Sequence, residues 1–119
     1  MVGVRVYAFD VDETLEVSAG PIPLKALMDL RIEGHIVGIC GNWGLLVQRC
    51  PGWQHLVSFL NVLGDKPTFL AHLKHFVPAT DFVMVGNILG VSGSSDDQGA
   101  ARSAGWRFIK ESDFAAGAR

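Results

Sequence analysis

The stretch VYAFDVDETL (Val6–Leu15) decides how the rest of this chain is interpreted. The segment Val2–Phe9 is short, rich in β-branched and aromatic residues, and apolar at both odd and even positions. This pattern is typical of a strand buried on both faces, as in parallel sheets that are covered by helices. We expect the strand to stop at Asp10, because the acidic run Asp10–Glu13 continues a buried strand poorly and suits the rim of a site.

Strand and helix patterns alternate along the remaining sequence. The predicted elements are a helix at Leu24–Glu33, a strand at His35–Cys40, a short helix at Trp43–Arg49, a helical turn and then a short strand near Leu60–Leu63, a helix at Pro67–Phe76, a strand at Asp81–Gly86, a helix from about Asp96 to Ser103 and a strand at Trp106–Ile109. The apolar run His55–Leu63 suits a helix as well as a strand. Strands that alternate with helices predict an α/β fold with a parallel sheet.

Composition narrows the class of protein. The chain has 119 residues, which is the size of one domain with a real core. Ten basic and twelve acidic residues give a net charge of -2, so we expect neither nucleic-acid nor membrane-surface binding. The two cysteines form neither a disulfide framework nor a zinc motif, and no apolar run approaches the roughly 20 residues that span a bilayer. We therefore expect a cytoplasmic protein.

Polar and small residues collect at the carboxyl ends of the predicted strands, where ligands bind in such sheets. They are Asp10 and Asp12 after the first strand, Gly41 and Asn42 after the second, Asn87, Asp96 and Asp97 after the Asp81–Gly86 strand, and Lys66 before a helix. Carboxylate and amide oxygens suit Mg²⁺, and a lysine neutralises phosphate charge. The set therefore predicts a site for a divalent cation and a phosphate group.

The spacing of Asp10 and Asp12 is informative by itself. Residues two apart on an extended segment point the same way, so both carboxylates can face one substrate. One carboxylate would then attack phosphorus while the other exchanges a proton with the leaving group. An alternative is that the two aspartates only form a turn or cap a helix after the strand.

Several segments resemble the haloacid dehalogenase-like (HAD) superfamily. Val6–Leu15 is similar to its first motif, an apolar strand followed by Asp-x-Asp-x-Thr, and Lys66-Pro67 resembles the Lys-Pro of its third motif. The strand Phe82–Gly86 and the segment Asp97–Trp106 resemble the fourth motif and the helix after it. The resemblance covers nearly the whole chain. It implies one domain at residues 1–119, with a Rossmann-like three-layer αβα core around a mainly parallel sheet.

The resemblance also implies roles for individual residues. Asp10 would be the nucleophile and a magnesium ligand. Asp12 would protonate the leaving group and then activate water, with its backbone carbonyl on the metal. Thr14 would brace the loop, and Lys66 would hold the phosphate against Asp10. An aspartate of the fourth motif would complete the Mg²⁺ site.

Two positions depart from the family pattern. Members usually carry Ser or Thr at the end of the second strand, to bind phosphate, whereas this chain has Gly41 followed by Asn42. Backbone amides and the Asn42 side chain are the remaining donors there. The fourth motif usually reads Gly-Asp, but here Asn87 follows the glycine, and the next acids are Asp96 and Asp97. Either of these two could serve as metal ligand, and neutral Asn87 is a weaker one.

The spaces between the motifs are too short for the cap domain that many family members carry. The resemblance therefore implies a capless enzyme, whose open site suits a large phosphorylated substrate or a homo-oligomer in which a neighbour covers it. Our first hypothesis is a Mg²⁺-dependent phosphomonoester hydrolase that forms an aspartyl-phosphate. The second is a non-catalytic binding module with a degraded phosphate and metal site. A phosphotransferase or phosphoacceptor is a third hypothesis.

Overall fold

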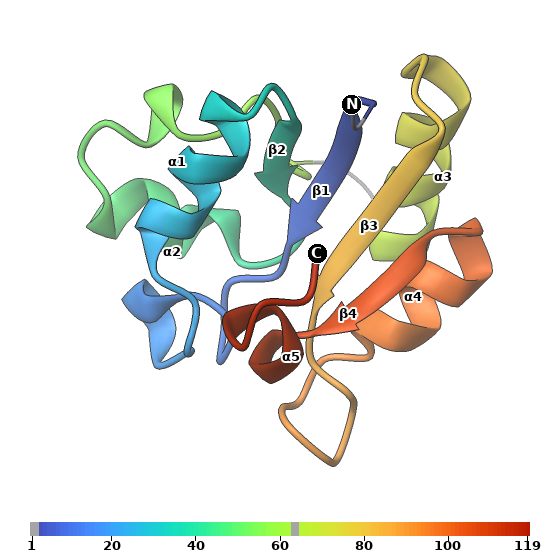
Figure 1. Ribbon diagram of the computed structural model, residues 1–119. Coiled ribbons are helices and arrows are strands. Elements are labelled where there is room, and N and C mark those ends of the chain that lie inside the picture. The colour runs from blue at the N-terminus through green and yellow to red at the C-terminus, as the bar shows by residue number, and fades with distance from the viewer. Residues whose placement is uncertain (1–2, 63–64) are drawn as a thin grey trace.

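The computed structural model describes residues 3–62 and 65–119 and contains one parallel sheet with the strand order β2-β1-β3-β4 (Figure 1). The strands are β1 Arg5–Phe9, β2 Ile36–Ile39, β3 Asp81–Gly86 and β4 Arg107–Lys110. The helices are α1 Leu24–Ile32, α2 Trp43–Arg49, α3 Lys66–Phe76, α4 Asp97–Ala104 and α5 Glu111–Ala115, and the 3-10 turns are η1 Glu16–Ser18 and η2 Trp53–His55. The predicted α/β class with a parallel sheet is confirmed.

The register of the sheet brings three strand ends to one edge. Phe9 at the end of β1 pairs with Ile39 of β2 and with Val85 of β3. The backbone N–H of Asp10 donates to the Val85 carbonyl at 2.9 Å, so the hydrogen bonding continues one residue past β1. Asp10 is thereby held by the backbone at the centre of the carboxyl edge.

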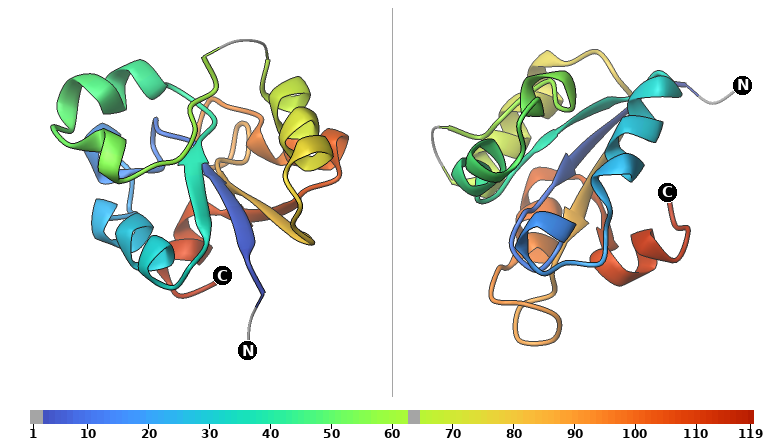
Figure 2. Two further views of the ribbon diagram at one scale, coloured as in Figure 1. Left: turned by 90° about the horizontal axis from the view of Figure 1, so that it is seen from above. Right: turned by 90° about the vertical axis from the view of Figure 1, so that its left-hand side faces the viewer.

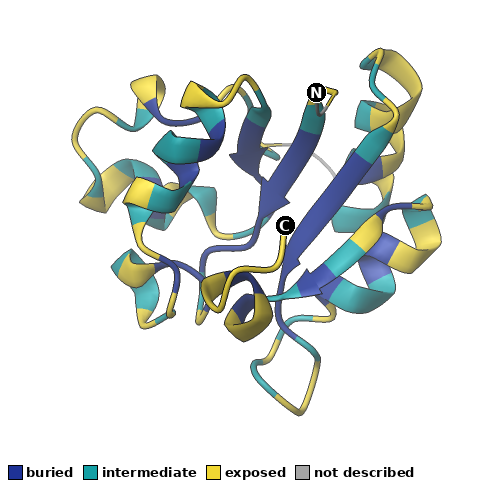
Figure 3. Ribbon diagram, in the orientation of Figure 1, coloured by how far each residue is buried: buried dark blue, intermediate teal, exposed yellow. Residues whose placement is uncertain are grey.

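Alternate residues of the strands contribute to two apolar clusters, and Figure 3 shows β1 and β3 as almost entirely buried. Tyr7 and Phe9 belong to one cluster, which also includes buried side chains of α1, α2 and α5. Val6 and Ala8 belong to the other, which includes Leu70 of α3 and residues of α4. The period of two in β1 thus explains why its residues are apolar at both parities.

Most predicted elements are found within one or two residues of their predicted ends. The predicted strand near Leu60–Leu63 is wrong over the residues described: Leu60 makes only an isolated bridge to Ile39. Leu63 and the start of the first strand at Val2 lie outside the described residues. The helix α5, Glu111–Ala115, follows the last predicted strand and was not predicted.

The segment between β2 and α3 contains α2 and η2, and the left view in Figure 2 shows both on the same side of β2 as α1, with α3 on the other side. Leu46 of α2 is buried, and Trp43 and Trp53 pack against the first cluster. The two tryptophans therefore contribute to packing. Over the residues described, no helix has both the length and the apolar character needed to cross a membrane.

Candidate functional site

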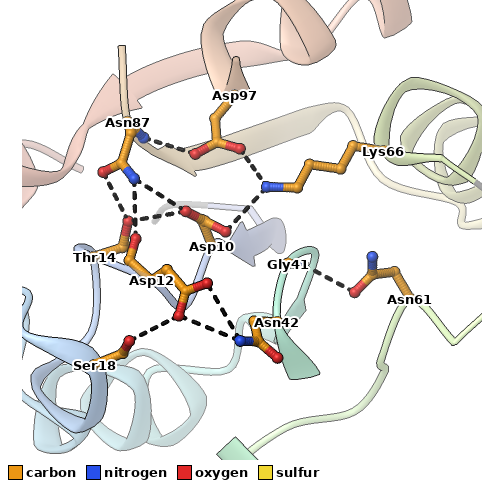
Figure 4. Close-up of polar contacts among 10 residues, drawn as sticks. All are labelled: Asp10, Asp12, Thr14, Ser18, Gly41, Asn42, Asn61, Lys66, Asn87 and Asp97. Atoms are coloured by element: carbon orange, nitrogen blue, oxygen red, sulfur yellow. Dashed lines mark hydrogen bonds and ion pairs between the residues drawn. The ribbon is translucent and has the colours of Figure 1, made fainter. Parts of the chain in front are cut away.

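Asp10 lies at the centre of a polar cluster at the carboxyl edge of the sheet (Figure 4). Its residue surface is only 1% exposed, so its carboxylate depends on protein groups for hydrogen bonds. Those groups come from α3, from the loop after β3 and from the loop after β1 itself. The sheet, the helix α3 and the two loops thus build one site around the buried Asp10 carboxylate.

Lys66 is the cation of this cluster. It is the first residue of α3, which begins where the Asp65 side chain accepts a hydrogen bond from the Thr68 backbone at 2.8 Å. The Lys66 Nζ donates to Asp10 Oδ1 at 3.0 Å and to Asp97 Oδ1 at 2.6 Å. One ammonium group therefore bridges two buried carboxylates that lie on different elements.

Asn87, directly after β3, is fully buried and joins the same cluster. Its side-chain Nδ2 donates to Asp10 Oδ2 at 3.2 Å and to the backbone carbonyl of Asp12 at 2.9 Å. Its backbone N–H donates to Asp97 Oδ2 at 2.7 Å. Asn87 thus connects all three of the site's aspartates.

Thr14 closes the loop after β1 on itself. Its backbone N–H donates to the Val11 carbonyl at 3.1 Å, which makes a tight turn. Its buried hydroxyl lies 3.4 Å from Asp10 Oδ2 and 3.2 Å from Asn87 Oδ1, and can donate to either. Thr14 therefore holds the loop and the Asn87 amide in register.

Asp12 lies in a different environment from Asp10. Its side chain is half-buried, and its carboxylate accepts from the Ser18 hydroxyl at 2.8 Å and from Asn42 Nδ2 at 3.3 Å. Over the residues described, the Asp12 carboxylate makes no hydrogen bond to Lys66, which donates to Asp10 and Asp97. The two aspartates of the motif thus differ in solvent access and in partners.

Gly41 lies against Asp10, which explains the absence of a side chain at this position. A Cβ at Gly41 would collide with Asp10 Oδ1 and would lie 3.0 Å from the Val11 nitrogen. Its backbone N–H donates to the side-chain oxygen of Asn61 at 2.9 Å. No room exists for the hydroxyl residue that the family pattern has here, and this backbone amide is already engaged.

Two neighbouring acids at the start of α4, Asp96 and Asp97, have different environments. Asp97, the first residue of the helix, is buried and belongs to the cluster. Asp96 is the N-cap: its side chain accepts from the Gly99 backbone N–H at 3.0 Å, and among the described residues it makes no hydrogen bond or ion pair with Asp10 or Lys66. Asp97 is therefore the residue of the pair that is positioned to act in the site.

The electrostatics of the cluster follow from its burial. Desolvation, together with the negative charge of Asp97, raises the pKa of Asp10 to about 7 in spite of Lys66. Burial by itself would lower the pKa of Lys66, but Asp10 and Asp97 outweigh this effect and raise it. The site thus holds two buried carboxyl groups against one ammonium group, so a bound cation would favour the ionised form of Asp10.

A half-turn of the Asn87 amide would give the site a set of three oxygen atoms suited to Mg²⁺. Among the residues described, no three His, Cys, Asp or Glu side chains gather as a metal cluster, so any site must also use a carbonyl or amide oxygen. The end of the Asn87 side chain lies 3.2 Å from Asp10 Oδ2 and 2.9 Å from the Asp12 carbonyl oxygen. Neighbouring oxygens around octahedral Mg²⁺ lie about 3.0 Å apart. A half-turn of the Asn87 amide would present a third oxygen at this spacing.

Three residues near the site could not be predicted. Ser18 binds the Asp12 carboxylate, Asn61 binds the Gly41 backbone, and a Cβ at Gly93 would collide with the Asn87 side chain. All three lie in loops or turns without a motif. Each of these residues contacts a residue that is not its neighbour in sequence, and no sequence pattern predicts such contacts.

Cys40 precedes Gly41 but is no nucleophile. Its side chain is fully buried, and burial raises the pKa of its thiol to about 12. The thiol is therefore protonated and inaccessible at neutral pH.

Comparison of the chain with protein-family models, with curated proteins and with solved structures found no match. The geometry of the cluster around Asp10 is thus the basis on which a function can be proposed.

Proposed function

We propose that the chain is a Mg²⁺-dependent phosphomonoester hydrolase of the HAD type, built on a three-layer αβα core without a cap. The observation that carries the proposal is the Lys66 bridge, in which one ammonium group lies 3.0 Å from Asp10 Oδ1 and 2.6 Å from Asp97 Oδ1. A lysine held beside a buried carboxylate is suited to bring a phosphate dianion up to that carboxylate.

In the proposed reaction, an oxygen of Asp10 forms a bond to phosphorus and the bond from phosphorus to the leaving-group oxygen breaks. The Asp12 carboxyl group gives its proton to that oxygen. A water molecule then attacks phosphorus, Asp12 takes the water's proton, and the bond between phosphorus and Asp10 breaks, releasing inorganic phosphate. The half-buried position of Asp12 supports its role, since leaving group and water must both reach it.

Three residues would hold the cation, Asp10 through Oδ2, Asp12 through its carbonyl and Asn87 through its amide oxygen, while Asp97 would hold Lys66 and the Asn87 backbone. Bound Mg²⁺ would offset the negative charge of the reacting phosphoryl group. Lys66 would hold one phosphoryl oxygen, and Thr14 would keep the Asp10 loop in place. Two free cysteines fit a reducing compartment, so a cytoplasmic setting belongs to the proposal.

The test is turnover of an aryl phosphate with and without Mg²⁺ by the wild type, by Asp10→Asn and by Asp113→Asn. Asp113 is an exposed acid on α5 and serves as the matched control. We expect metal-dependent turnover that Asp10→Asn abolishes and Asp113→Asn leaves unchanged. Treating the wild type with hydroxylamine during turnover should convert a phospho-aspartate at Asp10 into a hydroxamate, which mass spectrometry detects. Turnover by Asp10→Asn at the wild-type rate would exclude this mechanism.

A second candidate function, a non-catalytic binding module, is favoured by a different observation. The Asn87 amide already occupies Asp10 Oδ2 and the Asp12 carbonyl, and Gly41 has neither a hydroxyl nor space for one. Such a site would be complete without a metal. The absence of turnover with any phosphomonoester, together with the absence of Mg²⁺ binding by calorimetry, would favour this module over the hydrolase.

The accessibility of the proposed site indicates what size of substrate or partner could cover it. Over the residues described, the chain forms η1 between β1 and α1 and forms α2 and η2 between β2 and α3, and Asp12 is only half-buried. These observations support a site that is open on the Asp12 side. We therefore expect a large phosphorylated substrate, or a second copy of the chain that covers the site. Light scattering of the protein in solution, with and without Mg²⁺, distinguishes a monomer from an oligomer.

A further inference from the structure

The Asn87 side chain stands where two potential cation ligands converge. Its Nδ2 has two hydrogens, and both are used, on Asp10 Oδ2 and on the Asp12 carbonyl. A backbone carbonyl can only accept, so the nitrogen end of the amide must face it in this arrangement. The oxygen end faces the Thr14 hydroxyl at 3.2 Å. Every polar atom of the buried amide is thus satisfied without a cation.

The same neighbours also satisfy the opposite orientation. A hydroxyl both donates and accepts, so after a half-turn of the amide, Thr14 Oγ1 can accept from Nδ2. Its own hydrogen can then turn to Asp10 Oδ2, which is 3.4 Å away. The amide oxygen would then face Asp10 Oδ2 and the Asp12 carbonyl, and three oxygens would repel one another unless a cation lay among them.

We propose that Asn87 works as a two-position residue, which closes the cation site with its amide nitrogen when the site is metal-free and contributes its oxygen when a divalent cation binds. This inference rests on the proposed function for the identity of the site, and it adds how cation entry is controlled. Mg²⁺ binding would be coupled to rotation of one buried side chain. The loop after β3 leaves the space, since Gly93 packs on Asn87 without a Cβ.

An aspartate at position 87 would behave differently. It would have no donor for Asp10 Oδ2 or for the Asp12 carbonyl, and it would add a third buried negative charge beside Asp10 and Asp97. The metal-free protein would lose stability. With a cation present, the added charge would strengthen binding. Compared with an aspartate, Asn87 therefore lowers the affinity for a cation and stabilises the metal-free protein.

The test compares the wild type with Asn87→Asp and with the control Asn61→Asp. Asn61 lies next to the site, but its side-chain oxygen accepts from Gly41, so the control adds a charge nearby without adding an oxygen at the cation position. Calorimetry with MgCl₂ alone gives the affinity, and thermal unfolding in EDTA and in MgCl₂ gives the stability. We expect Asn87→Asp to bind Mg²⁺ about tenfold or more tightly and to unfold at a lower temperature in EDTA, with Asn61→Asp binding within about twofold of the wild type.

A second measurement uses the wild type alone, in case Asn87→Asp does not fold. A ¹⁵N–¹H spectrum assigned at Asn87 follows its side-chain NH₂ pair during titration with MgCl₂. We expect the pair to shift and its hydrogens to exchange faster with water, because it leaves two buried acceptors for one. Saturation with Mg²⁺ without a change in this pair would overturn the proposal, as would equal Mg²⁺ affinity in Asn87→Asp and the wild type, or absence of Mg²⁺ binding by the wild type.

None of these readouts is turnover, so the two proposals fail separately. If the wild type hydrolyses phosphomonoesters but Asn87→Asp changes neither affinity nor stability, the rotation is excluded and the hydrolase remains. If the amide responds to Mg²⁺ as described but no substrate is turned over, the rotation stands at a site that binds a cation without catalysis.

Discussion

At the scale of single residues, the site depends on which atoms face Asp10. Lys66 supplies a cation on one side of its carboxylate, and Asn87 supplies an uncharged donor on the other. The Gly41 backbone lies against the third side of the carboxylate, where a side chain would collide with it. Each of the three contacts has a different chemical character, and substitutions should therefore have different effects.

Replacing Gly41 with serine, the family-like residue, should damage the site. The new Cβ would collide with Asp10 Oδ1, so we expect a loss of about 1–3 kcal/mol in the free energy of unfolding and no gain in phosphatase activity. Urea denaturation measures the first and aryl phosphate turnover the second. Gly44→Ser is the matched control, because a Cβ at Gly44 meets nothing within 4 Å, and its stability should match or exceed the wild type's. A Gly41→Ser protein as stable as the wild type would contradict the close approach.

Asp10 should make the metal-free protein less stable as pH rises. Its pKa is raised from 3.8 to about 7 in the folded state, so over this range the folded protein binds more protons than the unfolded one. Stability is then greatest below the lower value and falls as pH rises through the higher, by a few kcal/mol at most. Denaturation in EDTA between these pH values should show the fall in the wild type and in Asp113→Asn. Asp10→Asn should lack this contribution, and an identical slope in that variant would assign it to other groups.

At the scale of elements, the site is assembled from the starts of helices and the ends of strands. Lys66 and Asp97 are the first residues of α3 and α4, and these helices pack against each other. Each helix begins with an aspartate cap, Asp65 or Asp96, whose side chain binds a backbone amide of the first turn. The caps begin the helices at the points that place Lys66 and Asp97 at the carboxyl edge, next to Asp10.

Substituting the two neighbouring acids of α4 should separate structure from function. Asp96→Ala removes only the cap and should cost about 1 kcal/mol of stability, with turnover and Mg²⁺ affinity unchanged. Asp97→Asn removes the charge that Lys66 contacts and should lower turnover by about 10- to 100-fold, an effect typical of losing a group that orients the site. Urea denaturation and steady-state kinetics on both variants make the comparison. Loss of activity in Asp96→Ala with full activity in Asp97→Asn would reverse the assignment.

At the scale of the whole molecule, the last helix completes the core that supports the site. Phe114 of α5 packs edge-on against Phe9, the residue before Asp10, with ring centroids 5.2 Å apart. It also contacts Tyr7, and the Arg119 guanidinium lies 4.0 Å from its ring centre. Beyond the sheet edge, the loop between β3 and α4 projects outward (Figure 1), and Ser92 in it donates to Glu111 of α5 at 3.1 Å. The helix α5 thus contacts both the strand that precedes Asp10 and the loop that follows Asn87.

Phe114→Ala should therefore be among the most destabilising changes in the chain. Truncating this buried ring should cost about 3–5 kcal/mol, because a cavity opens beside β1. Phe76→Ala is the matched control, since Phe76 is 75% exposed, and its stability should stay within about 0.5 kcal/mol of the wild type. Urea denaturation followed by tryptophan fluorescence measures both. A similar cost for the two would show that α5 contributes little to the core.

Local patterns were enough to predict most of the fold. The period of two in β1 and β3, the helical spacing between them and the acidic break at Asp10 all depend on neighbours in sequence. Neighbours in sequence did not predict the helix α5 at the end of the chain, and they wrongly predicted a strand at Leu60. Phe114 is buried by residues more than a hundred positions earlier, and Leu60 has one bridge to Ile39 with no ladder to extend it.

The sequence by itself determined the alternating α/β order and the set of residues at the strand ends, because each depends on short-range pattern and on the rule that parallel strands end together. Only the tertiary structure decided between Asp96 and Asp97, excluded a side chain at Gly41, and turned the Asn87 nitrogen toward Asp10. These outcomes depend on contacts of a few ångströms between segments that are 31 to 77 residues apart. Spacing along the chain carries no information at that distance, whereas packing of the sheet and helices sets it.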